Sequence, residues 1–171
     1  MPDLARRSAL LAMLTGAGLG GLGCSLREPV PSFGYTLLDG VPRHSTGLRG
    51  KVVLVNFWAT SCAVCVHEMP EIAATHQRFR GRGLEVLAVA VRSDAPAAVS
   101  NFAQARHLPF GVAIDNAGAI AAAFGDVDVT PTSLLLDRHG VVVWRHLGAP
   151  DFAALHGRLE RLLAEGATAS A

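Results

Sequence analysis

Two cysteines, Cys62 and Cys65, follow an apolar run that extends from Val52 to Phe57. A continuous apolar run of this length predicts a strand that is buried on both faces. The residues after it, Ala63 to Arg80, have apolar side chains at helical spacing. At the start of a helix, the unpaired N–H groups and the helix dipole favour a thiolate over a thiol. We therefore expect Cys62 to act as a nucleophile.

Cys65 lies one helical turn further along the chain, close enough to Cys62 to form a disulfide. We expect Cys65 to face the sheet and to resolve the bond that Cys62 makes. A static disulfide is the alternative, but a C-x-x-C loop at a helix start is short and strained, which favours a reducible bond. A zinc site needs four ligands, and the sequence has no second cysteine pair. We expect no metal and no organic cofactor, because the disulfide itself is the redox group.

The elements around the two cysteines alternate between strands and helices. A second buried strand is predicted from Leu84 to Val91, which makes a strand–helix–strand crossover with the first strand. The other predicted elements are two helices, an antiparallel hairpin and a last helix, at Ala95–Arg106, Ala117–Phe124, Ser133–Leu136 with Val141–His146, and Asp151–Leu163. This order predicts an α/β fold.

Composition limits the kind of protein further. Half of the 171 residues are apolar, which is enough for one substantial core. Charged residues make up 17% of the chain and its net charge is +1, so a nucleic-acid-binding surface is not expected. We expect one domain over residues 32–165 and a flexible tail over residues 166–171.

The first residues predict export. Arg6 and Arg7 precede a weakly apolar run from Ala9 to Gly23, which contains no acidic residue and ends in small residues. This is the arrangement of a secretory signal peptide, and the run is too short to be assigned as a membrane span. We expect residues 1–23 to be the signal peptide and residues 24–31 to be a tether. An uncleaved amino-terminal anchor is the alternative.

Cys24 stands at the end of this signal. The sequence Gly21-Leu22-Gly23-Cys24 resembles a bacterial lipoprotein signal, in which the cysteine is acylated. Such signals usually place Leu three residues before the cysteine, where this chain has Gly21, and an ordinary cleavage after small residues fits equally well. The pair Arg6-Arg7 also resembles a twin-arginine signal. Acylation of Cys24 and the export route both stay open.

Four motifs together resemble the TlpA/ResA-like branch of the thioredoxins, which work outside the cytoplasm. They are Val55-Asn56-Phe57-Trp58-Ala59-Thr60, the C-x-x-C pair, Glu68-Met69-Pro70 and Val129-Thr130-Pro131-Thr132. The likeness covers about residues 32–165. It implies a thioredoxin-like fold with a central mixed β-sheet flanked by helices, and the activity of a thiol-disulfide oxidoreductase.

The resemblance also implies a substrate groove beside the cysteines. Pro131 corresponds to the cis-proline that thioredoxins place opposite the redox pair, and Thr130 precedes it in the groove. Trp58 fits the family position and is expected to pack near the site. Many members have Trp immediately before the first cysteine, where this chain has Ser61, so the apolar platform beside Cys62 is expected to be smaller.

Glu68 corresponds to the acid that, in ResA-like proteins, helps to set thiol acidity and to move protons. It follows Cys65 by three residues and so falls one turn further along the helix, roughly on the same face. Asn56 stands where general thioredoxins keep a buried Asp, which leaves the proton work to Glu68. A solvated Glu68 with no role is the alternative. Pro70 matches the proline that kinks the motif helix in this fold.

These expectations together describe a periplasmic or otherwise extracytoplasmic reductase, anchored to the inner membrane if Cys24 is acylated. Its expected partners are disulfide-bearing envelope proteins, apocytochrome c among them, and a membrane thiol donor of electrons. One alternative is a thiol peroxidase, although that pattern places Thr three residues before the cysteine, where this chain has Ala59. The other is a copper-handling relative, although those usually space their cysteines by three.

Overall fold

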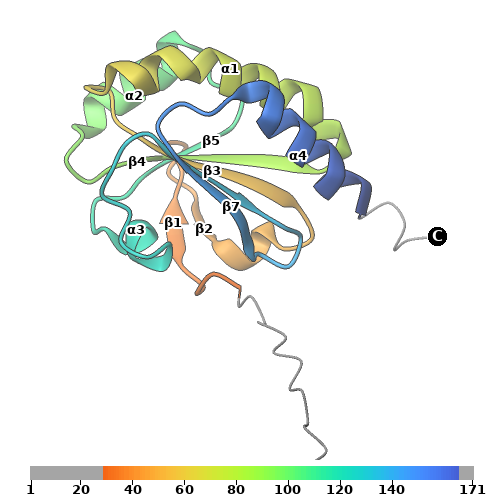
Figure 1. Ribbon diagram of the computed structural model, residues 1–171. Coiled ribbons are helices and arrows are strands. Elements are labelled where there is room, and N and C mark those ends of the chain that lie inside the picture. The colour runs from red at the N-terminus through yellow and green to blue at the C-terminus, as the bar shows by residue number, and fades with distance from the viewer. Residues whose placement is uncertain (1–28, 166–171) are drawn as a thin grey trace, which may run out of the picture.

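The computed structural model describes residues 29–165 and shows a five-stranded sheet with helices on both faces and a short hairpin beside it (Figure 1). The strands of the sheet are β3 (Val52–Trp58), β4 (Leu84–Ala90), β5 (Gly111–Ile114), β6 (Thr132–Leu136) and β7 (Val142–Leu147). The hairpin consists of β1 (Gly34–Thr36) and β2 (Pro42–His44). The helices are α1 (Ala63–Phe79), α2 (Pro96–Ala105), α3 (Ala119–Ala123) and α4 (Phe152–Glu165), with 3-10 turns η1 (Ser45–Leu48) and η2 (Arg80–Arg82). The predicted signal peptide, Cys24 and the predicted tail lie outside the described residues.

The sheet is mixed, with the strand order β5-β4-β3-β6-β7. Strand β3 pairs in parallel with β4, and β4 pairs in parallel with β5. Strand β6 runs antiparallel to β3, and β7 runs antiparallel to β6. The register places Asn56 of β3 beside Ser133 of β6. Because β6 runs antiparallel, Pro131 just before it comes to the level of Trp58, the last residue of β3.

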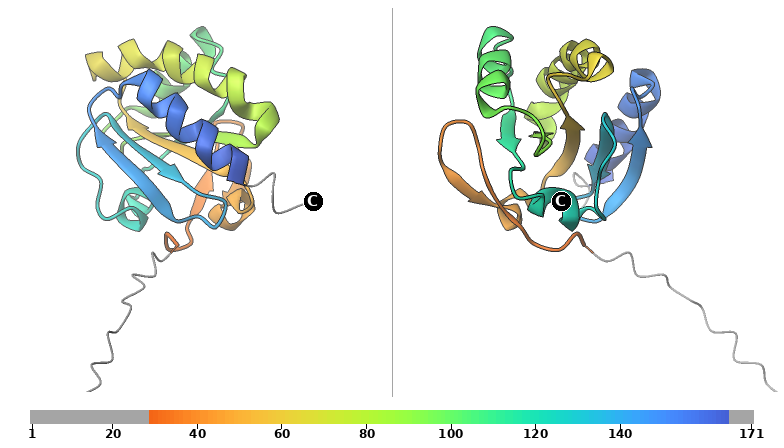
Figure 2. Two further views of the ribbon diagram at one scale, coloured as in Figure 1. Left: turned by 45° about the vertical axis from the view of Figure 1, so that its right-hand side comes forward. Right: turned by 90° about the vertical axis from the view of Figure 1, so that its left-hand side faces the viewer.

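Helices α1, α2 and α4 cover one face of the sheet, whereas α3 and the hairpin cover the other (Figure 2). The side chains of β3 alternate between the two cores. Leu54 and Trp58 pack on the α1 face, and Val53 and Val55 pack on the α3 face. Every residue of β3 is buried, as expected for a strand covered on both sides. The predicted thioredoxin-like α/β fold with a central mixed sheet is confirmed.

Most elements lie within two residues of their predicted bounds, and Pro70 lies inside α1 as predicted. Strand β5 and the hairpin of β1 and β2 were not predicted from the sequence. Strand β5 has only four residues, and its geometry depends on parallel pairing with β4, which is distant in the sequence. The hairpin strands have three residues each and are mostly exposed, so no apolar periodicity marks them.

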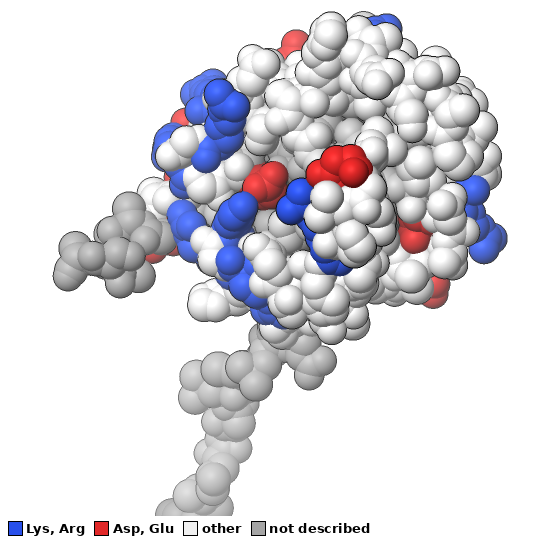
Figure 3. All heavy atoms as spheres, turned by 180° about the vertical axis from the view of Figure 1, so that it is seen from behind, with Lys and Arg blue, Asp and Glu red and all other residues white. Residues whose placement is uncertain are grey.

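The charged side chains are unevenly spread over the surface. Residues 29–165 contain twelve basic and twelve acidic residues, so their formal charges cancel. In Figure 3, which shows the back of the molecule, Lys and Arg side chains gather toward the left. This is the end of the molecule at which α1 and α4 finish in Figure 1.

Candidate active site

Cys62 caps the amino terminus of α1, and Cys65 lies in the first turn of that helix. A disulfide joins them, and their Cα atoms are 5.2 Å apart. The backbone N–H of Cys65 donates a hydrogen bond to Cys62 Sγ at 3.2 Å. Cys62 is half-buried, whereas Cys65 is completely buried. A second molecule can therefore reach the sulfur of Cys62 but not that of Cys65.

Asp94, which the sequence analysis did not single out, holds the turn between β3 and α1. Its carboxylate accepts hydrogen bonds from the backbone N–H and from the hydroxyl of Thr60, each at 2.6 Å. The next contact along the turn is the N–H of Cys62, which donates to the carbonyl of Ala59 at 3.2 Å. Thr60 and Asp94 follow two parallel neighbours, β3 and β4, so both lie at the carboxyl edge of the sheet. A polar residue after each predicted strand was the signal available in the sequence.

Thr130 and Pro131 lie at the same edge of the sheet, because they precede β6, which runs antiparallel to β3. The peptide bond between them is cis, and Pro131 is buried. The hydroxyl of Thr132 donates to the carbonyl of Val129 at 2.7 Å, which closes the turn before β6. Thr130 and Ser61, the residue before the first cysteine, line one groove. The structure therefore brings together the two segments that the sequence analysis placed beside the redox pair.

Glu68 lies inside the protein, one turn beyond Cys65 on α1, and is 2% exposed. Its Oε1 accepts a hydrogen bond from Asn56 Nδ2 at 2.9 Å, and the same amide also donates to Ser133 Oγ at 3.1 Å. Glu68 Oε2 has no partner among the described residues. The burial raises the pKa of Glu68 from 4.5 to about 7, against the opposing effect of the Asn56 hydrogen bond. The alternative of a solvated Glu68 is wrong.

Trp58 packs in the core next to the site. Its side chain is completely buried in the same core as Cys65 and packs against Phe102, with ring centroids 5.0 Å apart. It was expected among the groove residues, but in this structure no part of it is exposed to a client. Ser61, by contrast, is exposed beside Cys62. Val64, inside the C-x-x-C motif, is also exposed, so the surface next to Cys62 combines a small polar residue with an apolar one.

A groove of about 510 Å³ has Ser61 and Thr130 among its lining residues, and Ser61 places it beside Cys62. Its walls come from the loops that follow β3, β4 and β5 and from the loop before β6. Arg92 stands in one of these loops and Asp126 and Asp128 in another, and all three side chains are exposed. None of the ion pairs within residues 29–165 involves them. Their charges therefore remain available to a bound molecule.

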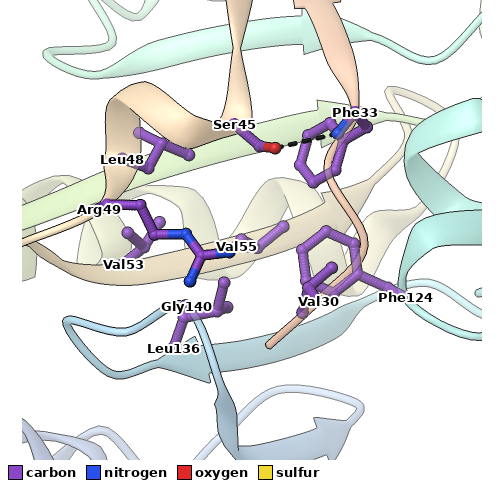
Figure 4. A pocket seen from close by; sticks show the side chains of 10 residues that line it. All are labelled: Val30, Phe33, Ser45, Leu48, Arg49, Val53, Val55, Phe124, Leu136 and Gly140. Carbon is purple, nitrogen blue, oxygen red and sulfur yellow. Dashed lines mark hydrogen bonds between the residues drawn. The ribbon is translucent and has the colours of Figure 1, made fainter. Parts of the chain in front are cut away.

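A second pocket lies under the amino-terminal hairpin, on the face of the sheet opposite α1 (Figure 4). Apolar side chains such as Phe33, Val55 and Phe124 point into it, and Ser45 Oγ accepts a hydrogen bond from the N–H of Phe33 at 2.9 Å. Its cavity is about 20 Å³. Such a space holds one water molecule at most, so it is not a ligand site.

Residues 29–165 offer neither a metal site nor a helix that could span a membrane. No three His, Cys, Asp or Glu side chains there are arranged to hold a metal ion. None of the helices in this range has the length and apolarity needed to cross a membrane.

Comparison with known proteins agrees with this geometry. The family model described as Redoxin matches residues 26–157. The thiol-disulfide oxidoreductase ResA of Bacillus thuringiensis (strain Al Hakam) is 35% identical over 135 residues, which are 79% of this chain and 77% of that protein. Both matches include the cysteine pair and the Thr130–Pro131 turn.

Two solved structures have the same fold. A thiol:disulfide interchange protein of the thioredoxin family from Chlorobium tepidum TLS superposes with a TM-score of 0.72 at 28% identity, over 79% of this chain and 95% of that one. DsbF of Mycobacterium tuberculosis, solved in mixed oxidized and reduced forms, gives a TM-score of 0.69 at 27% identity, over 76% of this chain and 94% of that one. The chain therefore belongs to the Redoxin family, as a thiol-disulfide oxidoreductase of the ResA type.

Proposed function

We propose that this protein reduces disulfides of other proteins outside the cytoplasm, with Cys62 as the attacking thiolate and Cys65 as the resolving one. The observation that carries the proposal is the difference between the two sulfurs: Cys62 caps a helix and is partly exposed beside a groove, whereas Cys65 is buried behind it. An exposed, stabilised thiolate suits attack on a large partner. A buried sulfur that is joined to Cys62 and closed to outside molecules suits the second step.

The reaction has two exchange steps. The Cys62 thiolate attacks one sulfur of the client disulfide, so a mixed disulfide forms and the client's other sulfur leaves as a thiolate. The Cys65 thiolate then attacks Cys62 Sγ, which closes the Cys62–Cys65 bond and releases the second client thiolate. Two electrons pass from the dithiol to the client, and both client sulfurs take up protons. The redox group is the disulfide alone, and a membrane thiol donor restores the dithiol.

The fold supplies the charge stabilisation that the first step needs. The N–H of Cys65 points at Cys62 Sγ, and the unpaired N–H groups at the start of α1 favour negative charge there. Removing a proton from the buried Cys65 needs a nearby base. Glu68, with a pKa of about 7, changes protonation near neutral pH and lies on the same helix face one turn away. We assign it that role, with Asn56 and Ser133 fixing its orientation.

The groove suggests what clients this protein prefers. A client cysteine that reaches Cys62 lies between Ser61 and Thr130, and its neighbouring residues enter the groove. There they meet the carboxylates of Asp126 and Asp128, with Arg92 as the single opposing charge. Clients with Lys or Arg next to the reactive cysteine are therefore favoured over clients with acidic neighbours.

The proposed location follows from the amino-terminal sequence. Arg6 and Arg7, the apolar run from Ala9 to Gly23, and Cys24 support export with an optional lipid anchor at the membrane. Disulfide-bearing envelope proteins, including apocytochromes c, are then the clients within reach. Such clients need a reductase because disulfides form readily in that compartment.

Substitution of each cysteine tests the order of the two steps. Cys62→Ser should reduce the rate of insulin disulfide reduction to the uncatalysed level, since no nucleophile remains at the exposed position. Cys65→Ser should form a mixed disulfide with insulin that persists, because the resolving thiol is missing. Mass spectrometry of non-reduced samples measures the covalent complex directly.

Cys24→Ser is the control and should keep the wild-type rate. Retained activity in Cys62→Ser, or a persistent complex on Cys65 in place of Cys62, would refute the proposed assignment. Rapid peroxide consumption by Cys65→Ser without a mixed disulfide would point to a thiol peroxidase instead.

Glu68→Gln should remove a pH dependence of stability. Burial raises the pKa of Glu68 above its ordinary value, so folding favours the protonated carboxyl, and its contribution is fully present below about pH 4.5 and lost as pH rises through about 7. The shift from 4.5 to about 7 corresponds to a loss of about 3 kcal/mol over that window. Urea denaturation of the disulfide form at pH 4.5 and pH 8 should show this loss in the wild type but not in the neutral Gln variant.

Glu71→Gln is the matched control, because Glu71 lies on the same helix but is exposed. It should retain the wild-type dependence on pH. Equal pH profiles for wild type and Glu68→Gln would show that the Glu68 carboxyl does not carry the effect.

The double variant Asp126→Asn/Asp128→Asn tests the client preference. It should slow reduction of a disulfide peptide with Lys beside its cysteine about threefold at low ionic strength, as expected for loss of exposed charge interactions. The rate for the matching Glu peptide should stay the same or rise. Stopped-flow Trp fluorescence follows both reactions, and Arg92→Gln should change the two rates in the opposite sense. An equal effect on both peptides would contradict charge-based selection.

A further inference from the structure

One end of the molecule, remote from the cysteines, carries a surplus of positive charge. Seven basic residues from four segments of the chain make up this surface, which we call the basic end: Arg49, Lys51, Arg78, Arg80, Arg82, Arg138 and Arg161. The acidic residues among them are Glu85, Asp137, Glu160 and Glu165. In Figure 3, blue side chains outnumber red ones toward the left, which is this end of the molecule.

Hydrogen bonds and ion pairs connect the segments into one surface. Arg138 Nη1 donates to the carbonyl of Gly50 at 2.7 Å, and its Nη2 donates to the carbonyl of Leu163 at 3.5 Å. Glu160 of α4 pairs with Arg82 at 2.5 Å and with Arg78 at 3.4 Å. The loop before β3, the end of α1 and the end of α4 therefore meet at the basic end.

Part of the positive charge is not neutralised there. Lys51 pairs with Glu85 at 2.8 Å. Glu160 pairs with both Arg78 and Arg82, so one negative charge faces two positive ones. Arg49 and Arg138, by contrast, donate to backbone carbonyl groups, of His139 and Gly50 respectively. A carbonyl satisfies a guanidinium N–H without cancelling its charge, so the surface keeps a net positive potential.

The cysteines lie at the opposite end. Helix α1 has 17 residues between its caps Cys62 and Arg80, so the two ends are about 25 Å apart at 1.5 Å per residue. The loops around the cysteines carry Asp94, Asp126 and Asp128. Since the charges of residues 29–165 cancel overall, the domain has a charge dipole that points from one end to the other.

The amino-terminal segment joins the domain at the basic end. The N–H of Val30 donates to the carbonyl of Gly140 at 2.9 Å, and the guanidinium of Arg49 packs against Gly140. The residues before Val30 include the apolar run from Ala9 to Gly23 and Cys24. The chain therefore enters the described domain beside Arg49, at the basic end.

We propose that the basic end docks on the anionic phospholipid headgroups of the membrane and directs Cys62 and Cys65 away from it, toward clients. The proposal rests on the proposed export of the chain. Anionic headgroups attract basic side chains within about one Debye length, so the surface needs to lie close to the bilayer. Attachment through the amino-terminal segment supplies that proximity, because it raises the effective concentration of the surface at the membrane.

Vesicle flotation of the full chain tests this docking. Binding to vesicles made from equal parts of phosphatidylglycerol and phosphatidylcholine should exceed binding to phosphatidylcholine alone, and the excess should vanish at about 1 M salt, where the Debye length is about 3 Å. Arg80→Gln/Arg161→Gln removes two exposed charges of the basic end. It should weaken the phosphatidylglycerol-dependent binding about tenfold and leave the phosphatidylcholine binding unchanged.

Arg92→Gln/Arg106→Gln is the matched control, because it removes two charges outside the basic end. It should keep the wild-type preference for phosphatidylglycerol. An equal loss in both double variants would overturn the proposal in favour of attraction to the whole domain. The absence of any phosphatidylglycerol preference would also overturn it and leave an acidic protein as the partner of this surface.

Insulin reduction without lipid separates the docking proposal from the proposed reductase function, because it reports the reductase activity alone. Its rate should be the same in wild type and Arg80→Gln/Arg161→Gln.

Discussion

Burial of strand β3 is the constraint on which the rest of the structure depends. All seven of its residues are buried, between β4 and β6 at its sides and between two cores on its faces. A strand so enclosed has a fixed register, because a slip of one residue would exchange its two faces. The end of β3 is fixed as well, and the cysteine pair begins four residues beyond it. Position, exposure and helix capping of Cys62 all follow from that end point.

Strand β3 also carries Asn56, a polar residue that holds the buried carboxyl group of Glu68. Asn56 is buried in the middle of β3 and binds both Glu68 of α1 and Ser133 of β6. A carboxyl group buried there with a single hydrogen-bond partner is less stable when charged, which is why its pKa rises toward neutrality. The burial that stabilises the core thus gives the site a group that exchanges protons at physiological pH.

The sequence predicted the fold and the site correctly where a local apolar pattern stands next to reactive residues. The apolar run Val52–Phe57, the helical spacing after it and the C-x-x-C pair predicted the strand, the helix and the site between them, and the structure confirms those elements. Asp94 and Ser133 were missed because their roles arise from contacts across the sheet, to Thr60 and Asn56. The short β5 was missed for the same reason. Non-local pairing leaves no periodic signal in so few residues.

The surroundings of Cys62 also depend on features that motifs do not encode. Ser61 gives Cys62 a small polar neighbour, Val64 is exposed in the motif, and the indole of Trp58 is turned into the core. The groove charges belong to loops after β4 and before β6, whose course the sequence did not predict. Motifs therefore identified the two cysteines, and the three-dimensional structure showed which side chains line the groove beside them.

The equilibrium redox titration of the Cys62–Cys65 pair tests the central claim most directly. The purified protein is equilibrated in glutathione or dithiothreitol buffers, its free thiols are alkylated, and the oxidised fraction is measured by mass. A reductase of this type predicts a two-electron transition at about −220 to −270 mV that is lost in Cys62→Ser. A transition above about −150 mV would identify an oxidant instead, and the lack of any reversible transition would contradict the dithiol mechanism itself.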